Sequence, residues 1–282
     1  MAKRSSQTSR KKAPRRSTTR RNSDAKASAL RESLLRDAQT LNFSFEEAAF
    51  DETLRLAEQE GLSCLEFAQR LLAKPARERR EARIDRRIRE ARFLGQKTLE
   101  EFDWTFNSQV IDRVRIEELS VGDFACRGDN LMMIGPSGVG KTHLLEGMGR
   151  RWCAAGLRVR YVTSAELLAD LAASLADRSL DKRLRYWSKF DVLILDEFAF
   201  DKIERMEHPQ APSLLYRVIN ARYSKCSTVV SSNVLAEDWP DYLSDPALAS
   251  ATLDRLVDNM ITLNFHKGKS YRAHRGQTKN KR

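Results

Sequence analysis

Residues 135–142, with the sequence Gly-Pro-Ser-Gly-Val-Gly-Lys-Thr, fit the pattern G-x-x-x-x-G-K-[ST] at every fixed position. An apolar run at 131–134 precedes this loop, and a helical pattern follows it to about Ala155, where Gly156 predicts the end of a helix. A glycine-rich loop between a strand and a helix surrounds phosphate with backbone N–H groups at the positive end of the helix. The sequence therefore predicts an α/β fold built around a nucleotide-phosphate site.

The residues of this loop have distinct predicted roles in binding ATP with Mg²⁺. Lys141 is expected to bridge the β- and γ-phosphates, and Thr142 to bind Mg²⁺ through its hydroxyl. His143 is expected to pack at the helix start and offer its backbone N–H to phosphate rather than act as an acid or base. The predicted nucleotide-binding residues are Gly135, Pro136, Ser137, Gly138, Val139, Gly140, Lys141, Thr142 and His143.

A second motif follows further along the chain, where the apolar run 192–195 ends in two adjacent acids, Asp196 and Glu197. Neighbouring side chains diverge in a strand, so the two carboxylates can serve different ends. Asp196 is expected to hold Mg²⁺ through coordinated water, and Glu197 to polarise the water that attacks the γ-phosphate. This pair favours an ATPase over a nucleotide kinase, which lacks a dedicated water-polarising acid.

Short apolar runs alternate with helical stretches from residue 130 onward. The predicted strands are 131–134, 159–163, 192–195, 228–232 and 261–265, with helices between the first four. That alternation favours a parallel sheet covered by helices on both faces.

The region before this sheet is predicted to be helical. Ser44 with Glu47 and Ser63 with Glu66 fit S-x-x-E capping boxes, and Gly61 between them predicts a helix stop. Helices are expected near 45–60 and 64–73, followed by a third segment at 76–94 after a break at Pro75.

Positive charge is concentrated at the two ends of the chain. The net charge is +11; residues 1–29 hold ten Lys/Arg and one Asp (+9), and residues 266–282 hold seven Lys/Arg and no acid (+7), which leaves −5 between them. Such tails suit a polyanion, although they could also serve only as solubilising ends.

The composition also indicates in which cellular compartment the protein is expected. The four cysteines are far apart and contain no C-x-x-C pair, so neither disulfides nor a zinc site is indicated, and no metal beyond Mg²⁺ is expected. No apolar run approaches the length of a membrane helix, and no secretory signal is visible. A cytoplasmic protein without a membrane partner is expected.

The sequence alone leaves the roles of several candidate residues open. Arg83, Arg86 and Arg87 belong to an arginine-rich helix that could face DNA or, with its interspersed acids, form a solvated face. Asn233 ends the strand 228–232 and could be a turn residue; Arg255 could be a helix-surface arginine paired with Asp254.

Several stretches together resemble the IstB family of transposition helper ATPases. They are KTLEEFD from Lys97, GPSGVGKTHL, RVRYVTSAELLADL, VLILDEF, the S-S-N strand end, and DPALASATLDR through KSYR. The resemblance covers roughly residues 30–272. It implies an AAA+ P-loop module without the usual helical lid, preceded by a small helical domain. It also implies ATP-dependent assembly on double-stranded DNA, recruitment or activation of a transposase, and a homo-oligomer (ring, spiral or filament) with ATP at subunit interfaces.

The resemblance assigns further residues and domains. It makes Asn233 a sensor asparagine and Arg255 an arginine finger acting on the neighbouring subunit. Lys182, Arg183 and Arg185 fall where a DNA-tracking helix is inserted in initiator-type relatives, although a plain basic helix surface is an alternative. The expected domains are a disordered basic arm at 1–29, a helical domain at 30–96, the AAA+ domain at 97–266 and a basic tail at 267–282.

Two other functions stay open at this point. One is a helicase loader of the DnaC type, which acts on single-stranded DNA and a replicative helicase. The other is a nucleotide-gated scaffold with negligible turnover, which only Glu197 and Arg255 disfavour. The chain departs from the family pattern in the segment 200–212 and in the length of its basic arm.

Overall fold

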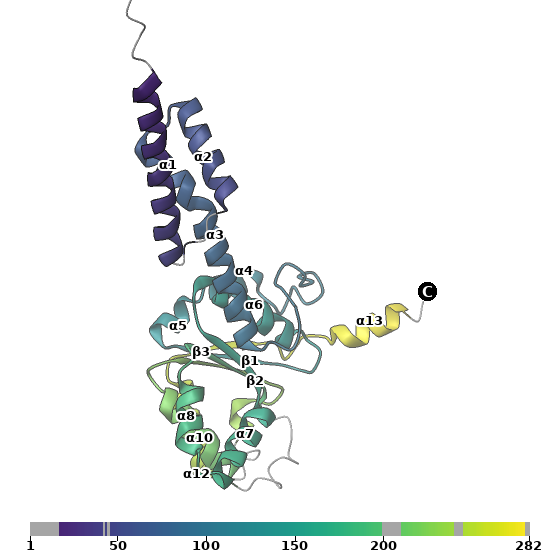
Figure 1. Ribbon diagram of the computed structural model, residues 1–282. Helices are drawn as coiled ribbons and strands as arrows, with labels where there is room; N and C mark the ends of the chain where they lie inside the picture. The colour runs from purple at the N-terminus through teal and green to yellow at the C-terminus, as the bar shows by residue number, and fades with distance from the viewer. Residues whose placement is uncertain (1–16, 42, 44–45, 199–209, 240–244, 280–282) are drawn as a thin grey trace, which may run out of the picture. The chain divides into compact units, whose positions relative to one another are not determined.

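The computed structural model of this 282-residue chain describes residues 17–41, 43, 46–198, 210–239 and 245–279 (Figure 1). The chain divides into two compact units, Met1–Glu81 and Ala82–Arg282. Most of the segment 200–212 lies outside the described residues. None of the described helices is long and apolar enough to cross a membrane.

The first unit is helical, as predicted. It contains α1 (Ser17–Thr40), α2 (Glu47–Glu60) and the part of α3 (Cys64–Ala91) that precedes residue 82. Gly61 ends α2 in the left-handed conformation, with φ 62°. Ser63 and Glu66 form the predicted capping box: the Ser63 N–H donates to the Glu66 carboxylate at 2.8 Å, and the Glu66 N–H donates to Ser63 Oγ at 3.3 Å. The other predicted box depends on Ser44, which lies outside the described residues.

Two predictions for this region are wrong. Pro75 does not break the chain, because α3 continues through it to Ala91. A proline removes one intrahelical hydrogen bond, and the Leu, Ala, Arg and Glu residues on both sides favour a helix strongly enough to continue past it. The arm 1–29 is not wholly irregular either, because α1 begins at Ser17; residues 1–16 lie outside the described part of the chain.

The second unit is built on a five-stranded parallel sheet with the order β2-β3-β4-β1-β5. Its strands are β1 (Asn130–Ile134), β2 (Val159–Thr163), β3 (Val192–Phe198), β4 (Ser227–Ser232) and β5 (Met260–Asn264). All five strands were predicted; β2 has the predicted bounds, and each of the other four differs by one to three residues at one or both ends. A parallel sheet with a phosphate loop after its first strand confirms the predicted α/β P-loop fold.

Helices cover both faces of this sheet (Figure 1). On one side lie α4 (Arg113–Ser120), α5 (Asp123–Arg127) and α6 (Lys141–Ala155); on the other lie α7 (Ser164–Ala176), α8 (Leu180–Ser188), α10 (Ala211–Arg222) and α12 (Pro246–Val257). Two shorter elements, η1 (Ala236–Asp238) and α13 (Tyr271–Lys279), complete this unit.

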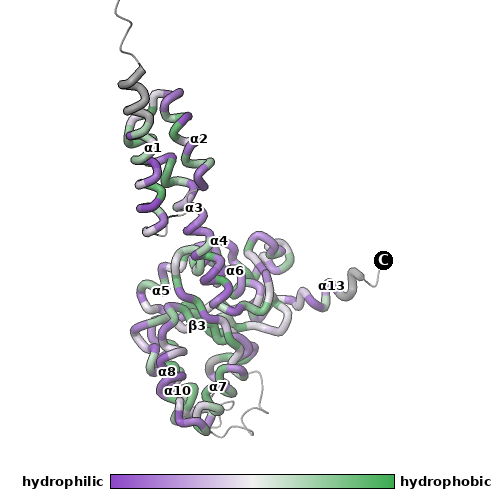
Figure 2. Tube along the Cα trace, viewed as in Figure 1, coloured by the Kyte–Doolittle hydropathy of each residue, from purple (hydrophilic) through white to green (hydrophobic). Residues whose placement is uncertain are grey.

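Alternating residues of a strand belong to two separate hydrophobic cores. Leu131 and Met133 of β1 pack with α6, whereas Met132 and Ile134 pack with α7, α10 and α12. Figure 2 shows hydrophobic residues gathered along the strands around β3. Because all strands are parallel, their carboxyl ends lie at one edge of the sheet. The candidate functional residues lie at this edge.

The boundary between the units was predicted after residue 96. In the structure it falls after Glu81. The reason is packing: Ile88, Ala91 and Phe93 join the core beneath α6. Residues 82–96 therefore belong to the nucleotide-binding unit.

Candidate functional site

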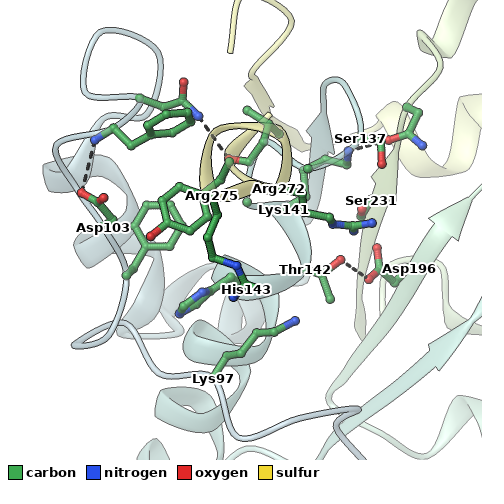
Figure 3. A pocket seen from close by; sticks show the side chains of 18 of the residues that line it. Lys97, Asp103, Ser137, Lys141, Thr142, His143, Asp196, Ser231, Arg272 and Arg275 are labelled. Carbon is green, nitrogen blue, oxygen red and sulfur yellow. Dashed lines mark hydrogen bonds between the residues drawn. The ribbon is translucent and has the colours of Figure 1, made fainter. Parts of the chain in front are cut away.

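A pocket of about 330 Å³ opens at the carboxyl edge of the sheet, around the loop after β1 (Figure 3). This volume lies within the range of small-molecule sites. The pocket is lined by Lys97, Glu101, Phe102, Asp103, Phe106, Asn107, residues 137–143, Asp196, Glu197, Ser231, Asn233, Tyr271, Arg272 and Arg275.

The loop needs its glycines for backbone geometry and for space. Gly138 and Gly140 have φ values of 81° and 117°, which side chains rarely adopt. A Cβ at Gly135 would come within 3.0 Å of the backbone of Phe265, so the chain after β5 passes directly against the loop. The predicted phosphate loop is therefore preformed.

Lys141 is buried at the base of this loop, at 8% exposure. Its ammonium donates to the backbone oxygens of Gly135 and Pro136 at 2.6 and 3.1 Å, and to Asn233 Oδ1 at 2.5 Å. Burial lowers the pKa of Lys141 to about 8, although the charge of Asp196 acts to raise it. The structure thus brings Lys141 and Asn233 together at the base of the loop.

Asp196, at the end of β3, is held by three donors. Thr142 Oγ1 donates to Asp196 Oδ2 at 2.9 Å, and the backbone N–H of Glu197 donates to Oδ1 at 2.9 Å. The Tyr161 hydroxyl donates to Oδ2 as well, and burial raises the pKa of Tyr161, so that it keeps this proton. A hydroxyl and a carboxylate oxygen side by side form a set of hard oxygen donors, which fits Mg²⁺.

Glu197 lies next to Asp196 but in a different environment. Its side chain is exposed and lines the pocket, whereas Asp196 is 2% exposed. The β3–β4 pairing is irregular between Leu195 and Phe198, and Glu197 there has a φ of 57°. Its backbone oxygen accepts a hydrogen bond from Ser164 Oγ at 3.0 Å. The two carboxylates are therefore separated by a local change in the strand as well as by alternation.

His143 connects the loop to the segment before α4. Its Nε2 lies 2.7 Å from the backbone oxygen of Thr98, and its ring packs edge-on to Phe102 at 5.1 Å. This agrees with the expected packing role at the helix start.

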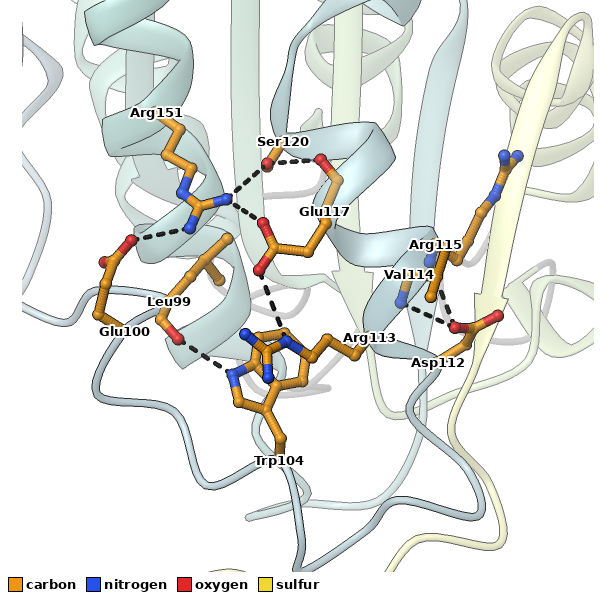
Figure 4. A network of polar contacts seen from close by, with 10 residues as sticks. All are labelled: Leu99, Glu100, Trp104, Asp112, Arg113, Val114, Arg115, Glu117, Ser120 and Arg151. Atoms are coloured by element: carbon orange, nitrogen blue, oxygen red, sulfur yellow. Dashed lines mark hydrogen bonds and ion pairs between the residues drawn. The ribbon is translucent and has the colours of Figure 1, made fainter.

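The segment 97–107 was missed as part of the site, and a polar network fixes it against α6 (Figure 4). Arg151 of α6 donates to Glu100 at 2.7 Å and to Ser120 Oγ at 3.1 Å, and it also pairs with Glu117. Trp104 Nε1 donates to the backbone oxygen of Leu99 at 3.2 Å. Lys97 pairs with the buried Glu146 of the same helix at 3.7 Å. Lys97 and Phe102 are thereby held at the pocket.

The chain after β5 was also missed. It was predicted as a basic tail from residue 267, but Tyr271, Arg272 and Arg275 line the pocket. The only signal in the sequence was the K-S-Y-R stretch, which carried part of the resemblance without an assigned role.

Arg255 does not line the pocket of its own chain. Its Nε donates to Asn220 Oδ1 at 2.7 Å, its Nη1 donates to the backbone oxygen of Ala251 at 2.9 Å, and its guanidinium lies 4.8 Å from the ring centre of Tyr216. It is held by α10 and α12 rather than paired with Asp254.

The candidate DNA-binding residues lie outside the pocket as well. On α3, Arg83 and Arg86 are exposed and Arg87 is half-buried; Arg86 pairs with Glu90 at 3.3 Å. On α8, Lys182, Arg183 and Arg185 are exposed, and Arg183 pairs with Asp170 at 3.3 Å. DNA contact by these six residues stays a prediction.

Comparison with known proteins identifies relatives over most of the chain. Residues 37–279 match the model of a family described as IstB-like ATP binding protein. A protein of insertion sequence IS21 from Pseudomonas aeruginosa, named for ATP binding, is 37% identical over 219 residues, which is 78% of this chain and 80% of the relative. One of insertion sequence IS5376 from Geobacillus stearothermophilus is 34% identical over 216 residues, which is 77% of this chain and 84% of the relative.

Among solved structures, the AMPPCP-bound DnaA of Aquifex aeolicus is similar at a TM-score of 0.49 and 19% identity. The match covers 67% of this chain and 56% of that one.

Proposed function

The chain belongs to the family of IstB-like ATP-binding proteins, and from this premise we propose that it hydrolyses ATP to control its own assembly on duplex DNA for transposition. The observation that carries the proposal is the convergence of Lys141, the Thr142–Asp196 pair and Glu197 around one pocket. Insertion-sequence relatives support the link to transposition.

The different surroundings of the two carboxylates support different roles. Asp196 is buried and bonded to three donors, so it suits a fixed metal-binding role with Thr142. Mg²⁺ bound there would neutralise charge on the phosphates. Glu197 is exposed in the pocket and suits the activation of water. Lys141 would hold the β- and γ-phosphates. Asn233, which accepts a hydrogen bond from Lys141, would orient the Lys141 ammonium.

Arg255 is proposed to complete the site of a neighbouring subunit. It lies outside its own pocket and is oriented by Asn220 and Tyr216, which keeps the long side chain in place. An arginine supplied in this way stabilises charge in the transition state of phosphoryl transfer. The active form would then be a homo-oligomer with ATP at its interfaces.

DNA and a transposase are the proposed partners. The two basic ends of the chain suit binding to the phosphate backbone of DNA. Such binding does not depend on the base sequence. The four free cysteine thiols are compatible with a reducing cytoplasm. A helicase loader acting on single strands, and a scaffold without turnover, are the two competing functions.

The in-trans role is tested by mixing inactive variants. Arg255→Ala and Lys141→Ala proteins should each lack turnover, and their mixture should recover part of it, because one supplies the pocket and the other the arginine. A mixture of Glu197→Gln with Lys141→Ala is the matched control and should stay inactive, since both lesions lie in the pocket. Absence of recovery at every mixing ratio would count against Arg255 acting on a neighbour.

The DNA partner is tested by comparing strands of equal nucleotide content. ATP-dependent assembly and turnover should be stimulated more by duplex than by single-stranded DNA, measured by sedimentation and phosphate release. A clear preference for single strands would favour the helicase loader. Assembly without turnover on either substrate would favour the scaffold.

A further inference from the structure

The guanidinium of Arg255 is half-buried and is held by neutral groups. Its Nε donates to Asn220 Oδ1 at 2.7 Å, and its Nη1 donates to the backbone oxygen of Ala251 at 2.9 Å. Its central carbon lies 4.8 Å from the centre of the Tyr216 ring. Among the described residues, no carboxylate lies within ion-pair distance of this guanidinium. The positive charge of Arg255 is therefore not neutralised by its surroundings.

These contacts leave part of the guanidinium available to a ligand. A guanidinium has five N–H donors, and the two hydrogen bonds use one donor on Nε and one on Nη1. In the part of the chain that the structure describes, Nη2 has no hydrogen-bond partner. One side of the Arg255 guanidinium is thus fixed, whereas Nη2 and the full charge stay free for a phosphate.

Asn220 is supported by a helix that is itself firmly held. Ile219, directly before Asn220 on α10, and Leu256, directly after Arg255 on α12, are buried in the same hydrophobic core. Arg222 of α10 is 1% exposed and donates to three backbone oxygens at 2.6 to 3.0 Å, at the end of α8, directly after it and at the start of β4. Asn220 therefore presents its amide to Arg255 from a fixed position.

The amide at position 220 has a chemical consequence. Asn and Asp have nearly the same size and shape, and either can accept a hydrogen bond through Oδ1. A carboxylate would also form an ion pair with the guanidinium and neutralise the charge that an arginine contributes to the transition state of phosphoryl transfer. Asn220 can orient Arg255 without competing with a phosphate for its charge.

We propose that Asn220 is the positioning residue for Arg255: its neutral amide orients the guanidinium toward the ATP of the neighbouring subunit and leaves the positive charge available there. The proposal rests on the in-trans role of Arg255 proposed above. It adds a residue that does not line the pocket of its own chain. Changes at Asn220 should therefore lower turnover and leave ATP binding unaltered.

Replacement of Asn220 by an isosteric acid provides the first test. Asn220→Asp should lower kcat for ATP hydrolysis by about 10²-fold, a part of the 10³–10⁵-fold that an arginine supplied in this way contributes. Asn220→Ala should lower it by about tenfold, because one hydrogen bond to a charged group is lost. The ATP affinity of both variants, measured by nucleotide titration, should equal that of wild-type protein.

The order of the two variants separates positioning from packing. If Asn220 only filled space, Asp would be tolerated better than Ala, because Asp keeps the shape of Asn; that order would overturn the proposal. Ser213→Asp is the matched control, since it adds a carboxylate at an exposed position of the same helix, about 10 Å before Asn220 along the axis. Its turnover should be that of wild-type protein.

A subunit that can only donate its arginine provides the second test. Lys141→Ala protein has a defective pocket and an intact Arg255, so it should restore turnover to Arg255→Ala protein. The double variant Lys141→Ala/Asn220→Asp should restore at least about tenfold less. Equal restoration by both donors would overturn the role of Asn220 while the in-trans role of Arg255 stands. Absence of restoration by Lys141→Ala itself would overturn both.

The reciprocal mixture shows whether the Asn220→Asp variant folds and assembles. This variant keeps its own pocket, so Lys141→Ala protein should restore its turnover by supplying a correctly held arginine. Failure of this mixture would mean that the change damages more than the position of Arg255, and would overturn the proposal. Circular dichroism melting of each variant, with and without ATP, verifies the fold and the ATP response independently of turnover.

Discussion

The two units of the chain differ sharply in how many apolar side chains they bury. In the first unit, Ala38 and Phe50 are the buried apolar residues among those described, while Leu30, Leu41 and Leu65 are 69%, 72% and 81% exposed. In the second unit, two cores flank the sheet and include Trp152, Leu144 and Leu193 at 0% exposure. Buried apolar area is the main source of stability, so the second unit is expected to be much the more stable.

Charge is distributed differently as well. Residues 1–29 hold ten Lys/Arg and one Asp, whereas residues 30–81 hold eight Lys/Arg and eleven Asp/Glu. The basic excess of the first unit therefore belongs to its arm and not to the rest of its helices. Chemistry and packing thus lie in the second unit, and the arm of the first supplies charge. ATP binding should therefore change the melting of the second unit, whereas removal of the basic arm from the first unit should change the salt dependence of DNA binding.

The largest effect is expected from Lys141→Ala. ATP at about a hundredfold excess over Kd should stabilise the second unit by about 2.7 kcal/mol, because it binds only the folded state. The variant should lose this stabilisation completely. Calorimetry should show ATP raising the melting transition of the second unit alone in wild-type protein. Lys225→Ala, exposed and outside the pocket, should behave like wild type; an unchanged ATP shift in Lys141→Ala would refute the phosphate-loop assignment.

The next effect separates binding from turnover within the second unit. Glu197→Gln keeps the size of the side chain but removes the charge, so hydrolysis should fall by about 10²–10³-fold while ATP binding is unchanged. Phosphate release and nucleotide titration measure the two properties. Glu118→Gln, an exposed acid on α4, is the control. Wild-type turnover in Glu197→Gln would assign water activation to another residue.

The second unit was largely predictable because its signals are local. Each strand is a short apolar run. Lys141 and Thr142 follow β1 by way of the phosphate loop, Asp196 lies near the end of β3, and Asn233 directly follows β4. The strands are parallel, so these residues meet at one edge of the sheet. The docking of the C-terminal segment was not predictable. It depends on Asn107 and Lys269, which lie 162 residues apart and belong to no periodic pattern.

The remaining misses have equally specific causes. Tyr161 falls within the predicted strand 159–163 and had no assigned role, and only the fold places its hydroxyl on Asp196. The break at Pro75 was predicted from the local effect of proline, which the rest of a 28-residue helix overrides.

A pH dependence should follow from the burial of Lys141, whose pKa is lowered to about 8 in the folded protein against about 10.4 in an unfolded chain. Between these values the unfolded state binds more protons, so the stability of the nucleotide-free second unit should rise with pH. ATP requires the charged lysine, so its affinity should fall by up to about tenfold per pH unit above 8. Calorimetry in buffers of different ionisation enthalpy should detect proton uptake on binding at pH 9; its absence would contradict a shifted Lys141.

Removal of residues 1–29 should affect DNA binding without affecting the ATP response. The logarithm of duplex affinity should fall with the logarithm of salt concentration by about 0.9 per phosphate contacted. Deleting the arm should flatten this slope by several units if the arm binds phosphate. The melting shift caused by ATP should stay the same. An unaltered slope would make the arm a solubilising end and weaken the division of roles between the units.

The smallest effect is expected from Tyr161→Phe, which removes one of the three donors to Asp196. The carboxylate keeps its charge but is less firmly oriented. The Mg²⁺ concentration for half-maximal turnover should therefore rise about tenfold, which is the low end of the effect of mutating residues that orient metal ligands. The Mg²⁺ dependence of the ATP melting shift should move equally, which a general loss of packing would not produce. Tyr223→Phe is the matched control, since it also removes a Tyr–Asp hydrogen bond, to Asp258, but away from the pocket. Equal Mg²⁺ requirements in both variants would mean that Thr142 and the Glu197 amide orient Asp196 unaided.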